Sequence, residues 1–156
     1  METLYGEILI PEAVYQEAVV AGKKAGYADA LTIERYVEAR KVKVIHLTVD
    51  VQRRMEALQL PSSLGTGERE TIIEALEGEC LAILDDLDSR AAASALGVSL
   101  CGSDTMLVEA LLKRLVALQD YEDKVTRLAS VMGMRADDLA ELLRLGRLIK
   151  EAIGNG

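Results

Sequence analysis

The sequence has no Phe and no Trp among its 156 residues, and its aromatic side chains are five Tyr. Apolar residues still make up 50% of the chain, so a hydrophobic core has to be built from Leu, Ile, Val, Ala and Met. Proteins that hold single-stranded nucleic acid commonly stack its bases on aromatic rings. With so few rings, we do not expect this mode of nucleic-acid binding.

Cysteine and histidine are also scarce. The chain has two Cys, Cys80 and Cys101, and one His, His46. A structural zinc site takes four Cys or His ligands at short, characteristic spacings, so this class of metal site is excluded. Both cysteines flank predicted strands, and a free cysteine is usually buried. We therefore expect Cys80 and Cys101 to be buried thiols.

Positive charge is low, with a net charge of −8 and a pI of about 4.8. The lack of a broad basic face argues against tight nonspecific binding to a phosphate backbone, although a small local nucleic-acid site stays open. No apolar run approaches the roughly 18 residues of a membrane-spanning helix, and no signal-peptide pattern is present. We expect a soluble, cytoplasmic protein that does not bind membranes.

What the sequence does contain is an alternation of short apolar segments with amphipathic ones. The predicted strands are Glu7–Ile10, Val42–Leu47, Leu81–Leu84 and Val98–Cys101. Helical patterns separate them, which is typical of a parallel sheet covered by helices on both faces. We predict a three-layer α/β/α domain over residues 1–118. A helical hairpin over residues 119–156 is expected to pack on that domain or on a partner subunit.

The stretch from Gly65 to Arg90 places two acidic residues at the beginnings of predicted helices. Thr66 is a suitable N-cap for a helix that carries Glu68. Asp86 follows the predicted strand Leu81–Leu84 at its carboxyl end, where open α/β sheets bind their ligands. We therefore expect Glu68 and Asp86 to approach each other at one edge of the sheet.

Several segments, read in order, resemble one family. They are Ile10-Pro11-Glu12-Ala13-Val14-Tyr15-Gln16-Glu17, Leu64-Gly65-Thr66-Gly67-Glu68, Ile83-Leu84-Asp85-Asp86-Leu87-Asp88-Ser89-Arg90, Leu96-Gly97-Val98 and Gly102-Ser103. Together they are similar to PIN-like domains, and most of all to a prokaryotic branch related to the toxins of toxin–antitoxin pairs. The resemblance extends from about Leu4 to Val116.

The resemblance implies a parallel sheet with helices on both sides and a cluster of acidic residues that binds Mg²⁺ or Mn²⁺. The activity it implies is metal-dependent cleavage of RNA phosphodiesters. Carried over by motif, Glu17, Glu68 and Asp86 are expected to be the catalytic, metal-binding carboxylates. Hard oxygen ligands of this kind suit Mg²⁺, which activates water and neutralises developing charge.

Three further residues enter the predicted site by position. Ser103 lies where the family often has a small hydroxyl residue near the metal, so it is a predicted substrate contact, and its neighbour Asp104 is a predicted metal ligand. Arg90 follows Asp86 by one helical turn. It is expected to contact a phosphate or, as the stronger expectation, to pair with Asp86.

The sequence departs from the PIN-like pattern at its beginning. The family normally opens with a strand that carries an Asp and lies in the middle of the sheet, and residues Met1 to Gly6 correspond to the end of the helix that follows it. We expect the flanking strands, Glu7–Ile10 and Leu81–Leu84, to pair directly and close the gap. A strand supplied from elsewhere, or a native protein that starts further upstream, stays open as an alternative.

Each predicted ligand also has an ordinary structural explanation. Glu68 suits the positive end of any helix, Asp86 is a good N-cap, and Glu17 can be a solvated surface acid. Two functions therefore remain open. The first is a toxin-type ribonuclease acting on RNA and controlled by an antitoxin-like protein. The second is a non-catalytic PIN-like binding or assembly module. In either case we expect a homo-oligomer, most simply a dimer.

Overall fold

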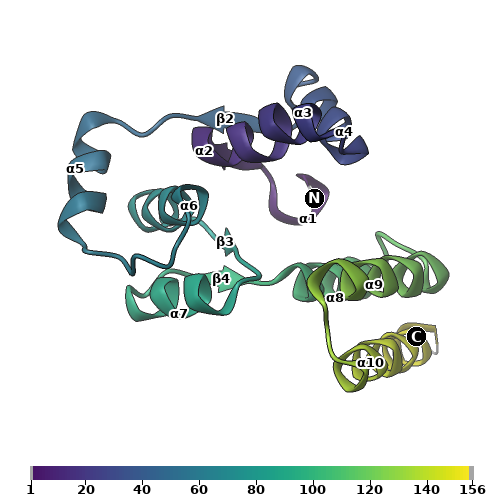
Figure 1. The fold of residues 1–156 in the computed structure, drawn as a ribbon. Coiled ribbons are helices and arrows are strands. Elements are labelled where there is room, and N and C mark those ends of the chain that lie inside the picture. The colour runs from purple at the N-terminus through teal and green to yellow at the C-terminus, as the bar shows by residue number, and fades with distance from the viewer. Residues whose placement is uncertain (1, 155–156) are drawn as a thin grey trace. The chain divides into compact units, whose positions relative to one another are not determined.

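The computed structural model describes residues 2–154, so the ends of the predicted domains at Met1, Asn155 and Gly156 lie outside the described residues. The chain divides into two compact units, Met1–Leu100 and Cys101–Gly156, and each is described by itself (Figure 1). The predicted division after residue 118 differs from this one. The difference arises because Leu111 is buried together with residues of the last two helices.

The first unit alternates short strands with helices. Its elements are α1 (Glu2–Tyr5), β1 (Leu9–Pro11), α2 (Glu12–Tyr15), the π-helix η1 (Gln16–Ala21), α3 (Gly22–Ala25), α4 (Ala28–Glu38), β2 (Lys43–Ile45), α5 (Val49–Ala57), α6 (Thr66–Glu77), β3 (Ala82–Ile83), α7 (Leu87–Ala95) and β4 (Leu100–Cys101). The predicted α/β class with short parallel strands is confirmed.

The strands form two separate sheets rather than one. β1 pairs with β2 in parallel, with Ile10 opposite Val44, and β3 pairs with β4. No ladder joins β1 to β3 anywhere in residues 2–154. The prediction that these two strands pair directly was therefore wrong. The physical reason is that both pack against α6, which holds them on either side of an open space.

Helix α6 is the central element of the first unit. Its buried face contributes Ile72 and Ala75 to a core cluster that also contains Ala82 of β3 and Ala93 of α7. The same helix packs against α2, α5 and β1. Its N-cap is Gly65 rather than the predicted Thr66, which is already the first helical residue.

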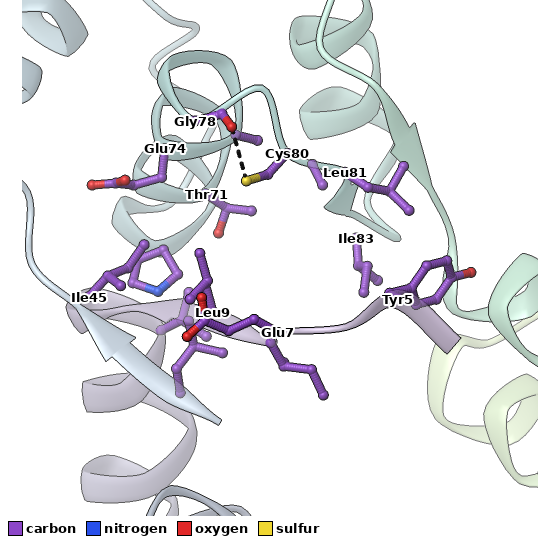
Figure 2. A pocket seen from close by; sticks show the side chains of 16 residues that line it. Tyr5, Glu7, Leu9, Ile45, Thr71, Glu74, Gly78, Cys80, Leu81 and Ile83 are labelled. Atoms are coloured by element: carbon purple, nitrogen blue, oxygen red, sulfur yellow. Dashed lines mark hydrogen bonds between the residues drawn. The ribbon is translucent and has the colours of Figure 1, made fainter. Parts of the chain in front are cut away.

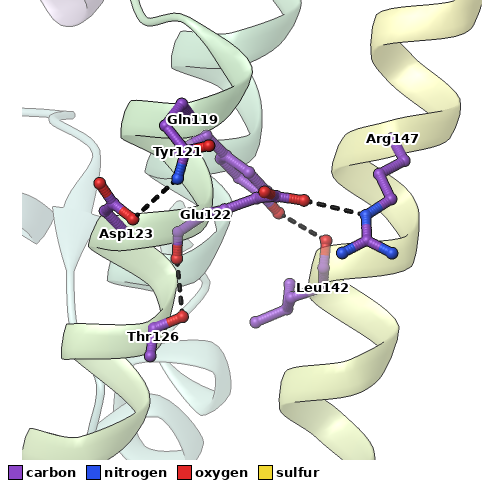
Figure 3. Close-up of polar contacts among 7 residues, drawn as sticks. All are labelled: Gln119, Tyr121, Glu122, Asp123, Thr126, Leu142 and Arg147. Carbon is purple, nitrogen blue, oxygen red and sulfur yellow. Dashed lines mark hydrogen bonds and ion pairs between the residues drawn. The ribbon is translucent and has the colours of Figure 1, made fainter.

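The second unit is helical and consists of α8 (Ser103–Leu112), α9 (Leu118–Met132) and α10 (Ala136–Gly154). Its core is built from Leu111, Tyr121, Val125 and Ile149. Tyr121 is fully buried, and its hydroxyl donates to the carbonyl oxygen of Leu142 at 2.9 Å (Figure 3). Arg147 Nε donates to Glu122 Oε1 at 2.9 Å, so α9 and α10 are joined by a buried and an exposed polar contact.

The two cysteines differ in burial. Cys101 is buried, as predicted, whereas Cys80 is exposed, so that prediction was wrong. Cys80 comes just after α6 has ended at Glu77, and its thiol donates to the carbonyl oxygen of Gly78 at 3.3 Å. Within residues 2–154, none of the helices combines the length and apolar character needed to cross a membrane.

Candidate functional site

Glu17 lies against the first turn of α6. A Cβ atom placed on Gly67 would come within 3.2 Å of Glu17 Oε2 and within 3.1 Å of Val14 Cγ2. The absence of a side chain at Gly67 is therefore what allows η1 and α2 to approach α6 so closely. This contact brings the predicted ligand Glu17 to the same corner of the molecule as Glu68, the residue that follows Gly67.

The Glu68 carboxylate caps the helix on which it stands. The backbone N–H of Gly65 donates to Glu68 Oε2 at 2.8 Å. This contact satisfies a donor at the positive end of α6, where a negative charge is favourable. Glu68 therefore has a structural role in addition to any catalytic one.

Glu70 is a residue of this corner that the sequence analysis did not single out. The backbone N–H of Ala13 donates to Glu70 Oε2 at 3.0 Å, which ties the start of α2 to α6. The two residues are 57 positions apart in the chain. No spacing rule links residues so far apart, and Glu70 could have been suspected only because it lies two positions after Glu68.

Asp86 is the N-cap of α7. Its Oδ2 accepts the backbone N–H of Ser89 at 2.9 Å, and its carbonyl oxygen accepts the Ser89 hydroxyl at 2.9 Å. Arg90 Nη1 donates to the carbonyl oxygen of Leu84 at 3.2 Å. No ion pair joins Arg90 to Asp86 in residues 2–154, so the predicted pairing was wrong. The arginine instead holds the chain between β3 and α7.

The two remaining predicted site residues belong to the second unit. Ser103 and Asp104 open α8, and Asp104 Oδ1 accepts the backbone N–H of Thr105 at 2.7 Å. Asp104 also helps raise the pKa of the Tyr121 hydroxyl, although burial of that hydroxyl is the larger cause. Their predicted roles as metal ligand and substrate contact stay predictions.

Comparison with known families shows to which family this chain belongs. A family described as a PIN domain matches residues 1–145, which is nearly the whole chain. This chain belongs to the PIN domain family. No curated protein and no solved structure matches it. The family assignment gives the PIN domain a nuclease-type fold in general, as the resemblance in the sequence implied.

PIN domains generally use divalent metal ions, which need several oxygen ligands that converge on one point. Across residues 2–154, no group of three or more His, Cys, Asp or Glu side chains is placed to hold a metal. Glu68 and Asp86 instead accept backbone N–H groups at the starts of different helices. In this arrangement Glu68 and Asp86 are engaged as helix caps and do not form a site for Mg²⁺ or Mn²⁺ with Glu17.

The PIN domain also has a cavity of about 450 Å³ between its two sheets, which we call the slot (Figure 2). Its walls are β1 with the segment before it, β3 with the segment before it, and one face of α6. The lining residues are Tyr5, Glu7, Ile8, Leu9, Ile10, Pro11, Val14, Ile45, Thr71, Glu74, Ala75, Gly78, Cys80, Leu81, Ala82 and Ile83. This volume lies within the range of about 300–1,000 Å³ that is usual for ligand clefts.

The slot carries a perturbed carboxyl group. The pKa of Glu74 is raised above 4.5, chiefly by burial and further by the neighbouring charges of Glu70 and Glu77. Glu77 is paired with Arg54 at 2.9 Å. No cation pairs with Glu74 in residues 2–154. On the α6 wall of the slot, Glu74 is thus an acidic group with no paired cation among the described residues.

Proposed function

We propose that this PIN domain is a ribonuclease that hydrolyses RNA phosphodiesters with Mg²⁺ or Mn²⁺ as cofactor. The observation that carries the proposal is the family match over residues 1–145. The position of Glu17 against the first turn of α6 supports it, since two of the predicted carboxylates, Glu17 and Glu68, share one corner. Asp86 is proposed as the third.

The caps made by Glu68 and Asp86 do not prevent this role. A side-chain cap stabilises a helix by only about 0.5–2 kcal/mol. A new interaction of similar strength is therefore enough to release either carboxylate from its cap. Activity then requires the carboxylates of this corner to change position, or another ligand to join them. Hydrolysis tolerates errors in position of only about 1 Å before the rate falls steeply.

Amide substitutions separate the catalytic role from the capping role. Glu68→Gln and Asp86→Asn keep a side-chain oxygen that can accept the capping hydrogen bond, but they remove the negative charge. We expect each to lower Mn²⁺-dependent cleavage of a labelled RNA at least 100-fold, the order of loss expected when a directly participating group is removed, while the melting temperature changes little. Asp88→Asn is the matched control, because Asp88 is an exposed acid in the first turn of α7.

A second function, a non-catalytic binding or assembly module, is favoured by one observation. Glu68 and Asp86 already have complete structural roles as caps. This function predicts that the wild-type protein cleaves no RNA with any divalent metal, and that Glu68→Ala and Asp86→Ala change only stability. Cleavage that is lost in the amide variants and kept in Asp88→Asn would exclude it.

Self-association and control by an antitoxin-like protein are further parts of the proposal. Exposed apolar side chains support an interface on the second unit, because Val131 and Met132 at the end of α9 are 86% and 41% exposed. Light scattering after size exclusion tests self-association. A dimer that becomes a monomer in Val131→Glu is the expected result, and a wild-type monomer at all concentrations contradicts it.

A further inference from the structure

A second cavity of the first unit, which we call the basic pocket, is lined mainly by positively charged side chains. It has a volume of about 360 Å³ and lies where β1 and β2 begin. Its lining residues are Gly6, Glu7, Ile8, Arg40, Lys41 and Lys43. Three of these residues are cations and one is an anion, whereas the whole chain has a net charge of −8. The basic pocket is therefore a local positive site on an acidic protein.

Two of these cations stand on a turn whose backbone is held by hydrogen bonds. The turn joins α4 to β2. The backbone N–H of Arg40 donates to the carbonyl oxygen of Val37 at 2.9 Å. The backbone N–H of Lys41 donates to the carbonyl oxygen of Tyr36 at 2.9 Å, and Lys41 Nζ lies 5.9 Å from the centroid of the Tyr36 ring. The backbone that presents the two positive charges to the pocket is therefore fixed.

Arg40 occupies a backbone position that favours glycine. It follows Ala39, the C-cap of α4, and its φ of 57° lies in the left-handed region. Glycine is preferred at this position because it has no Cβ atom. A cation is favourable near the negative end of a helix, but Lys41 already supplies one there. A residue kept in a disfavoured conformation motivates a functional explanation.

The charge of Arg40 is not neutralised within the protein. No carboxylate pairs with Arg40 among residues 2–154. Glu7 lies 3.7 Å from Lys43, and both side chains are largely exposed, so this pair is weak. The guanidinium group offers a rigid fork of N–H donors that matches phosphate oxygens, and lysine ammonium groups add positive charge. The chemistry of the pocket therefore suits a phosphate group.

We propose that the basic pocket binds one backbone phosphate of the RNA substrate, with Arg40 as the main contact. The proposal rests on the ribonuclease function proposed above. Helix α2 starts at the carboxyl end of β1, whereas the pocket lies at the amino end of this three-residue strand. A strand rises about 3.3 Å per residue, so the two ends are about 10 Å apart. The phosphate in the pocket is therefore not the one that is hydrolysed, and the pocket anchors the RNA away from the cleaved bond.

The salt dependence of RNA binding tests this contact without hydrolysis. The probe is a fluorescent single-stranded RNA, and its anisotropy is measured with the full chain in EDTA over a series of salt concentrations. Each phosphate contact to a single strand contributes about 0.7 to the slope of log K against log salt. We expect Arg40→Gln to weaken binding a few-fold at low salt and to reduce the slope by about 0.7. Arg127→Gln, which removes an exposed cation of α9, is the matched control and is expected to change neither quantity.

Glycine at position 40 separates RNA binding from folding. Arg40→Gly removes the cation but suits the left-handed backbone, so we expect its melting temperature to equal or exceed that of the wild type. Its RNA binding is expected to fall as in Arg40→Gln. Gln59→Gly makes the same backbone change at another exposed residue with positive φ, and it is expected to leave RNA binding unchanged. A stable variant that binds RNA weakly excludes misfolding as the cause.

Several results would overturn the proposal. One is RNA affinity and a salt slope that are unchanged in both Arg40 variants, and another is no RNA binding by the wild type even at low salt. A third is binding of inorganic phosphate or of a short peptide of Glu residues that is lost in the Arg40 variants while RNA binding is kept. The ligand would then be a free phosphate or an acidic polypeptide.

The same measurements distinguish this proposal from the proposed function. If the wild type cleaves no RNA with Mn²⁺ but RNA binding is weakened in the Arg40 variants, only the ribonuclease function fails. If the wild type cleaves RNA and the Arg40 variants bind and cleave it equally well, only the role of the basic pocket fails.

Discussion

Gly146 has to be glycine because of what lies beside it. A Cβ atom there would come within 2.4 Å of Tyr121 Cε1 and 2.8 Å of Tyr121 Cδ1. The ring cannot move away easily, because it is fully buried and its hydroxyl is bonded to Leu142. Overpacking of this kind typically costs about 1–3 kcal/mol.

We therefore predict that Gly146→Ala lowers the free energy of unfolding by about 1–3 kcal/mol, although Ala is the better helix former. Urea denaturation followed by circular dichroism measures the change. Gly154→Ala is the matched control on the same helix, since nothing lies within 4 Å of its added Cβ. Equal stability of the two variants would show that the Tyr121 ring is not packed as described.

Glu74 makes a pH-dependent contribution to stability. Its pKa is raised above 4.5 in the folded protein, mainly by burial. The folded state therefore holds the proton more tightly than the unfolded state, and stability falls as the pH rises through and above 4.5. We predict that Glu74→Gln has a higher melting temperature than the wild type at pH 7, and that the difference disappears at low pH. A lower melting temperature of the variant at pH 7 would contradict this.

At the scale of elements, the two polar contacts between α9 and α10 differ in how much they stabilise the protein. The Tyr121 hydroxyl bonds to a backbone carbonyl within the core, whereas Arg147 is 64% exposed in its pair with Glu122. A typical net hydrogen bond contributes about 0.5–1.5 kcal/mol, and an exposed ion pair about 0–1 kcal/mol. We predict from these ranges that Tyr121→Phe destabilises the protein more than Arg147→Ala, as measured by thermal denaturation in low and high salt. Salt is expected to change only the contribution of Arg147.

Most elements could be predicted from the sequence, because their signals are local. The two helices expected within residues 119–156 are α9 and α10, and Asp86 is the N-cap of α7. The pairing of strands could not be predicted in the same way. Whether β1 meets β3 depends on how α6 packs against both, and α6 is far from β1 in the chain. The sequence therefore indicated the strands but not the slot between them.

The candidate site shows the same limit. The motif order placed Glu17 and Glu68 in one family site, and the structure brings Glu17 to the start of α6 through the missing side chain of Gly67. The backbone contacts of Glu68, Glu70 and Asp86 were not predictable as a set, because each depends on which N–H group lies within about 3 Å. These caps are why the carboxylates do not converge on a metal.

At the scale of the whole molecule, the slot divides the first unit into two half-sheets held by one helix. Filling it with a strand would add hydrogen bonds to both edges and bury Leu9 and Ile83. Anything that binds only the folded state raises its apparent stability. Any strand that fills the slot is therefore expected to raise the melting temperature of the protein, which thermal denaturation measures.

Amide hydrogen exchange tests the central claim, that β1 and β3 each have a free edge on the slot. The account predicts that the N–H groups of Leu9 and Ile83 exchange rapidly, while those of Ile10 and Ala82, which face β2 and β4, are protected at least tenfold more, as expected for paired strand amides. Equal protection of all four amides in the free protein would contradict the account, because it would mean that the two sheets are already joined.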